Sequence, residues 1–102
     1  FIHSSDLAKA TIFALNKYDD DLHLNVGTGI DSTIQELAEV LAKILGFTGK
    51  LVWDNSKPDG TPRKVLDVSR LKNLGWSPTV SLENGISQTI QWYRENRGKV
   101  RT

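Results

Sequence analysis

Apolar side chains recur at helical spacing along three stretches of the chain, residues 7–17, 34–45 and 82–93. In the first stretch they wrap most of the helix circumference, which predicts a helix packed on more than one side. In the other two they form one stripe, which predicts helices with a single inward face. The two stripes are Ile34, Leu37, Ala38, Leu41 and Leu45, and then Leu82, Ile86, Thr89, Ile90 and Tyr93.

Residues typical of helix ends stand at the boundaries of these stretches. The expected N-terminal caps, in chain order, are Ser4 or Ser5, Thr33, Asp67 and Ser81. Thr33 and Glu36 have the spacing of a capping box, and Gly46 follows the same helix as a stop. The cap at Asp67 predicts a short fourth helix that Gly75 closes, and the polar tail 94–102 predicts a frayed terminus.

Two five-residue segments have strand character instead. Apolar and polar positions alternate in residues 22–26 and, less regularly, in 50–54. Two strands this short make a poor sheet alone, so we expect them to pair with strands outside the chain. The expected fold class is α/β, an α+β-like small domain of helices with short strands.

Composition narrows the classes of function. The 102 residues contain no cysteine, which excludes a thiolate nucleophile and a zinc–thiolate site. They also contain no methionine and begin with Phe1, which predicts a processed product or a piece of a longer protein. No apolar run approaches the roughly 18 residues of a membrane span, and a net charge of +1 gives no reason to expect nucleic acid.

Three features invite a site interpretation, but a plainer one is favoured for each. Gly27 and Gly29 lie between strand and helix, yet the third glycine of a dinucleotide loop is missing, so we expect a tight turn. The isolated His3 and His23 suit structural or surface roles rather than a metal site. The acidic run 19–21 lacks the spacing of a calcium loop and suits a solvated helix end.

The loop 55–64 is the stronger candidate for a binding site. Pro58 and Pro62 stiffen it, and Pro58-Asp59-Gly60 is typical of a turn. It carries the three cations Lys57, Arg63 and Lys64. Arginine and lysine grip phosphates, and the Asp59 carboxylate can accept hydrogen bonds from sugar hydroxyls. The loop therefore fits a sugar nucleotide, with a solvated surface turn as the alternative.

This loop also carries a resemblance. Residues 56–64, followed by Leu66-Asp67-Val68-Ser69-Arg70-Leu71 and Leu74-Gly75-Trp76, resemble the C-terminal region of the GDP-L-fucose synthase family, which are extended short-chain dehydrogenases/reductases. The segments 1–8, 25–29, 33–38 and 91–93 agree with it, so the resemblance covers essentially all 102 residues.

The resemblance implies an NADP-dependent parent enzyme. In that family an N-terminal Rossmann domain binds NADP and a smaller C-terminal domain binds the substrate. The enzyme epimerises GDP-4-keto-6-deoxy-D-mannose and reduces it with NADPH to GDP-L-fucose. Residues 1–102 then form the substrate-binding domain without the Rossmann domain. We expect this domain to be inactive alone and to contain no catalytic residue, cofactor or metal of its own. The parent enzyme is expected to be cytoplasmic and to dimerise through the missing domain.

The resemblance also assigns roles in substrate binding. It implies that Asp59 contacts the GDP-sugar and that Lys64 lies near the diphosphate, with Arg63 beside it as a weaker candidate. Two alternatives stay open. One is the C-terminal domain of another nucleotide-sugar epimerase or dehydratase, and the other is a standalone binding or scaffold domain.

Overall fold

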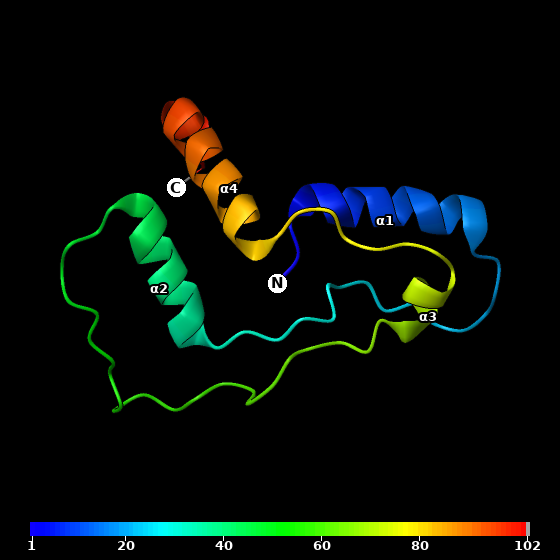
Figure 1. Ribbon diagram of the computed structural model, residues 1–102, viewed down its shortest axis with the longest axis horizontal. Helices are drawn as coiled ribbons and strands as arrows, with labels where there is room; N and C mark the ends of the chain where they lie inside the picture. The colour runs from blue at the N-terminus through cyan, green and yellow to red at the C-terminus, as the bar shows by residue number, and fades with distance from the viewer. Residues whose placement is uncertain (102) are drawn as a thin grey trace.

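Helices joined by long loops make up the chain. The computed structural model describes residues 1–101, with α1 (Ser4–Lys17), α2 (Ile34–Leu45), α3 (Ser69–Asn73), α4 (Leu82–Asn96) and the short 3-10 helix η1 (Arg97–Lys99) (Figure 1). Helices α2 and α4 pack against each other, and Lys43 reaches Glu83 across them at 3.7 Å. The stretch 46–68, which joins α2 to α3, contains no helix. Only its C-terminal end lies beside another segment, the loop that precedes α2 (Figure 1).

The ends of α2 and α4 form as the sequence predicts. The Thr33 hydroxyl accepts a hydrogen bond from the Glu36 N–H at 3.0 Å, while the Glu36 carboxylate accepts one from the Thr33 N–H at 2.9 Å. Gly46 ends α2 with a φ of +67°, and the Ser81 hydroxyl accepts from the Asn84 N–H at the start of α4. Both helix starts therefore have their first donors satisfied locally.

Three predicted helix ends are wrong in detail. The N-cap of α1 is His3, whose Nδ1 accepts from the Ser5 N–H, so neither Ser4 nor Ser5 has that role. Helix α3 begins one residue later than expected, and the Asp67 carboxylate satisfies the Ser69 N–H from just outside the cap. The tail is not frayed from residue 94, because α4 continues to Asn96 and η1 follows it.

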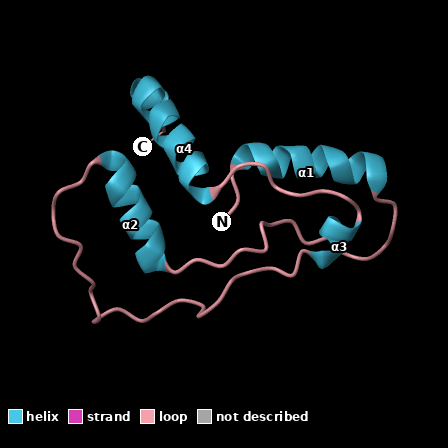
Figure 2. Ribbon diagram, viewed as in Figure 1, coloured by secondary structure: helices cyan, strands magenta, loops and turns pink. Residues whose placement is uncertain are grey.

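The two predicted strands do not form within residues 1–101, whose elements are all helices (Figure 2). Residues 24–31 and 63–68 do run side by side in opposite directions (Figure 1). However, a side chain makes the contact there, since the Asn25 amide donates to the Asp67 carbonyl at 3.2 Å. Residues 50–54 are exposed. A strand requires a ladder of backbone hydrogen bonds, and these extended segments have none.

Helix α1 packs along one edge only. Ala10 is fully buried on that edge, whereas Leu7, Ile12 and Leu15 are 46%, 61% and 80% exposed. The predicted packing on more than one side is therefore wrong within this chain. The radius of gyration is 16.7 Å, against about 13 Å for a compact domain of this length. Leu71 and Ala10 are the buried apolar residues among those described.

A buried carboxylate fixes the start of α1. Asp6 is fully buried and accepts hydrogen bonds from the Thr79 N–H (3.1 Å), the Thr79 hydroxyl (3.0 Å) and the Val80 N–H (2.9 Å). The Val80 bond lowers the pKa of Asp6 most, burial opposes it, and the Thr79 bonds and the charge of Lys9 lower it further. We call this arrangement the Asp6 lock; it ties α1 to the segment that leads into α4.

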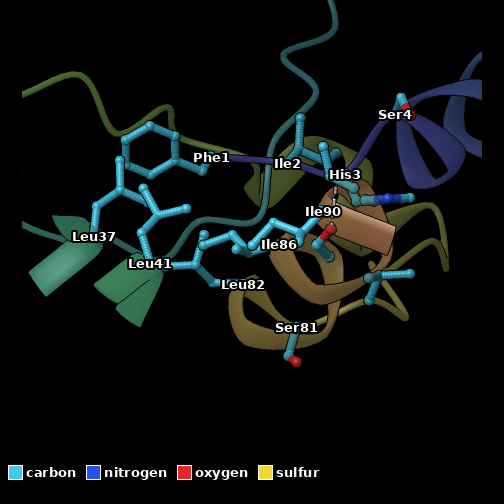
Figure 3. A pocket seen from close by; sticks show the side chains of 13 residues that line it. Phe1, Ile2, His3, Ser4, Leu37, Leu41, Ser81, Leu82, Ile86 and Ile90 are labelled. Carbon is cyan, nitrogen blue, oxygen red and sulfur yellow. Dashed lines mark hydrogen bonds between the residues drawn. The ribbon is translucent and has the colours of Figure 1, made fainter. Parts of the chain in front are cut away.

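An apolar cleft lies where the N-terminal residues meet α2 and α4. It has a volume of about 420 Å³, and Phe1, Leu37, Leu41, Leu82, Ile86 and Ile90 are among its lining side chains (Figure 3). Gly85 lines it too, where an added Cβ would stand 3.1 Å from the His3 ring. In the described part of the chain no helix is both long and apolar enough to cross a membrane.

Candidate functional site

The loop 55–64 borders a groove opposite the start of α2. The groove has a volume of about 580 Å³. Its walls come from residues 30–34 on one side and 60–65 on the other, with Phe1 at one end. In Figure 1 the loop that leads into α2 runs beside the green loop that joins α2 to α3. The groove is thus formed by segments about 30 residues apart in the sequence.

Local hydrogen bonds shape the beginning of this loop. The Asp54 carboxylate accepts from the Ser56 hydroxyl at 2.6 Å and from the Ser56 N–H at 2.9 Å, and both bonds lower the pKa of Asp54, the hydroxyl bond most. The chain therefore turns at residues 55–56. The turn predicted at Pro58-Asp59-Gly60 is wrong, because residues 58–60 make neither a turn nor a bend, and Gly60 does not adopt a positive φ.

The structure brings two of the three predicted site residues together. Arg63 and Lys64 both line the groove, while Asp59 lies in the exposed loop just before its wall. The hydroxyl-bearing residues Ser32 and Thr61 line the same groove. Two cations with neutral hydroxyls nearby suit an anion that also carries hydrogen-bonding groups.

Asp31 is the groove residue that the sequence did not indicate. Its carboxylate accepts a hydrogen bond from the Arg63 Nε–H at 2.7 Å, which is also an ion pair. The two residues are 32 positions apart, so no local spacing could reveal the pair. The only available signal was an acid placed just before the cap of α2.

The groove has the chemistry of binding rather than of reaction. It contains cations, one carboxylate and hydroxyls, without a histidine or a paired acid and base. Within residues 1–101 no group of three or more histidine, cysteine or acidic residues is placed to hold a metal ion. The apolar cleft of Figure 3 has no lysine, arginine or acidic residue in its lining, so it does not suit a diphosphate.

The glycine turn at residues 27–29 is filled by the protein itself. Gly29 has a φ of +72°, which confirms the predicted tight turn. A Cβ added there would stand 2.9 Å from the Val68 side chain, and one added to Gly27 would stand 3.6 Å from the same residue. In a dinucleotide loop the space beside the glycines belongs to the pyrophosphate. Residues 27–29 therefore do not fit that group.

Known proteins resemble this chain over nearly all of its length. GDP-L-fucose synthase 1 of Arabidopsis thaliana is 53% identical over 96 residues, which are 94% of this chain and 30% of the relative. GDP-L-fucose synthase of Escherichia coli K12 is 47% identical over 99% of this chain and 34% of the relative. The chain is similar to the C-terminal region of GDP-L-fucose synthases. No protein-family model matches it.

A solved structure supports the same assignment. GDP-mannoheptose C4 reductase from Campylobacter jejuni, with NADP bound, superposes with a TM-score of 0.81 and 39% identity, over 92% of this chain and 31% of that one. The predicted resemblance to GDP-L-fucose synthases is confirmed, and so is the fold at the level of extended short-chain dehydrogenase/reductase enzymes. The chain spans about a third of the length of these GDP-L-fucose synthases and of this reductase.

Proposed function

We propose that this chain is the GDP-sugar-binding portion of an NADP-dependent enzyme that epimerises and reduces GDP-4-keto-6-deoxy-D-mannose to GDP-L-fucose. The observation that carries the proposal is the groove. Its two cations, Arg63 and Lys64, stand in the sequence block that resembles GDP-L-fucose synthases most specifically. Identity near 50% to proteins named for that activity supports the same substrate class.

The remaining parts of the activity belong to the rest of the parent enzyme in this proposal. Residues 1–102 form the substrate domain, and a Rossmann domain upstream binds NADP(H), which supplies the hydride. The bound NADP of the Campylobacter jejuni relative supports the choice of cofactor, and the filled glycine turn at 27–29 supports its binding outside these residues. The predicted dimer and cytoplasmic location of the parent stay predictions. The isolated chain is expected to be inactive.

Three side chains contact the substrate in this proposal. Lys64 places a point charge beside the diphosphate, and Arg63 offers the guanidinium N–H groups that remain after its Nε bond to Asp31. Asp59, in the exposed approach to the groove, accepts hydrogen bonds from hydroxyl groups of the GDP-sugar. The loop's prolines limit the conformational entropy that is lost on binding.

Calorimetric titration of the full-length protein with GDP, UDP and dTDP tests the binding role. We expect GDP to bind most tightly, and Lys64→Ala to weaken GDP binding about tenfold because one charge-assisted hydrogen bond is lost. Lys57→Ala is the matched control, since Lys57 is a lysine of the same loop that does not line the groove. If both variants lost the same GDP affinity, the loss would reflect the positive charge of the loop in general, and the specific role of Lys64 would be wrong.

Turnover distinguishes the proposal from its alternatives. The full-length protein should oxidise NADPH when given GDP-4-keto-6-deoxy-D-mannose. Preference for a UDP- or dTDP-sugar would instead identify a different nucleotide-sugar epimerase or dehydratase. If the protein bound none of GDP, UDP and dTDP, the result would favour the standalone scaffold.

A further inference from the structure

The loop 55–64 has one polar link to the rest of the chain. Its other hydrogen bonds, from Ser56 to Asp54, are local, and every residue of the loop is exposed. The bond from the Arg63 Nε–H to Asp31 is the one hydrogen bond or ion pair that joins this loop to another segment within residues 1–101. The position of the groove wall therefore depends on this contact.

The pair also orients the guanidinium. A carboxylate that occupies Nε fixes the plane of the group, and the two Nη atoms are left for another acceptor. Both side chains line the groove, and Lys64 follows Arg63 directly. Because Asp31 precedes the capped start of α2, it is anchored to a helix while the loop is not.

We propose that Asp31 is a positioning residue for nucleotide binding, which acts by holding Arg63 and with it the wall that carries Lys64. This inference rests on the proposed function, because it concerns capture of the GDP diphosphate in the same groove. Asp31 itself does not touch the ligand in this account.

The sign of the effect separates this role from simple electrostatics. Asp31 places a negative charge beside an anion site, so its removal should strengthen GDP binding if charge alone matters. If Asp31 positions Arg63, its removal should weaken binding. Exposed ion pairs contribute up to about 1 kcal/mol, so we expect a loss of about two- to fivefold. The Asp31 and Arg63 side chains are 44% and 71% exposed, so substitution disturbs no core.

The test is a double-mutant cycle in the full-length protein, with GDP as the titrant. Asp31→Ala, which leaves Arg63 without this acceptor, should weaken GDP binding in the wild-type background. In the Arg63→Ala background it should leave binding unchanged or strengthen it, because only the charge of Asp31 then acts on the anion. In turnover, KM for the GDP-sugar should rise while kcat stays unchanged. Glu39→Ala is the control, since Glu39 is a carboxylate of α2 that does not line the groove.

A measurement without ligand keeps the inference separate from the proposed function. In the NMR spectrum of the free protein, the Arg63 Nε–H signal should be protected from exchange, and Asp31→Ala should remove this protection because alanine offers no acceptor. If that signal exchanges freely in the wild type, or if Asp31→Ala binds GDP as tightly as the wild type or more tightly, the positioning role is wrong. If the signal is protected but the wild type binds no GDP, the proposed function fails while the contact itself stands.

Discussion

The Asp6 lock and the loop 55–64 are both held by a carboxylate that accepts hydrogen bonds, but the first is buried and the second is exposed. Asp6 is fully buried and receives three hydrogen bonds from two adjacent residues. The loop is exposed throughout and is held to another segment by one ion pair. A buried carboxylate must have its oxygens satisfied, whereas an exposed cation has water as an alternative partner.

This contrast separates stability from binding along the chain. Residues of the lock should govern the folded state, because their loss leaves buried donors without acceptors. Residues of the loop should govern ligand binding. In the free protein their polar groups can hydrogen-bond to water, so their loss leaves no buried group without a partner. Substitutions can therefore test the two regions independently, with melting temperature for one and GDP affinity for the other.

Breaking the lock should have the largest effect on stability. Asp6→Ala removes the acceptor for the Thr79 and Val80 N–H groups, and we expect Tm to fall by an amount on the order of 10 °C. Thermal melting followed by circular dichroism measures it. Asp19→Ala, at an exposed acid beyond α1, should change Tm by about 2 °C or less. Similar melting of the two variants would refute the lock.

Acid should weaken the same contact. Since the folded-state pKa of Asp6 lies below its ordinary value of 3.8, its contribution is complete above that pH and is lost as the pH falls through the folded value. The Tm difference between wild type and Asp6→Ala should therefore shrink as the pH is lowered from about 5 to about 2.5. The lowered pKa values of Asp54 and Asp67 act in both proteins and cancel in this difference. A constant gap would count against this assignment.

The glycine turn should come next. Gly29→Ala meets both a positive φ and the Val68 side chain at 2.9 Å, so we expect a loss of about 1–2 kcal/mol in the free energy of unfolding. Gly60→Ala is the control, because its Cβ has open space, and its effect should stay within about 0.5 kcal/mol. Adding Val68→Ala to Gly29→Ala should recover only the steric part. Full recovery would mean that the backbone angle carries no cost.

The loop should show the smallest change in stability. Asp59→Asn alters an exposed side chain, so we expect Tm to stay within about 1 °C of the wild type. GDP-sugar binding should weaken about tenfold, since a charged acceptor is lost. Asp21→Asn, an exposed acid outside the groove, should alter neither quantity. A large fall in Tm for Asp59→Asn would erase the division between the two regions.

Local features were predictable from the sequence, and long-range ones were not. The capping box of Thr33 and Glu36 needs only residues three apart, and its hydrogen bonds form as expected. Nothing in the sequence pattern indicates the buried role of Asp6, because its partners lie 73 and 74 residues away. Alternation in residues 22–26 identified an extended segment, but a strand also needs a backbone partner.

The candidate site, too, was predictable from the sequence only in part. Charge and proline content identified the loop, and its two terminal cations do line a groove. The opposite wall came from residues 30–34, for which no pattern indicated a site. The chain turns at residues 55–56, where Ser56 bonds to Asp54, and not at the predicted residues 58–60.

The sequence separation of the Asp6 lock sets an order of events during synthesis. The carboxylate leaves the ribosome 73 to 74 residues before its partners, which is roughly 4 to 15 s at about 5–20 residues per second. During that interval α1 lacks the contact that fixes its start, so the helix can unfold more readily and meet chaperones. A ribosome stalled before residue 79 should therefore carry a nascent chain whose α1 is cut readily by protease.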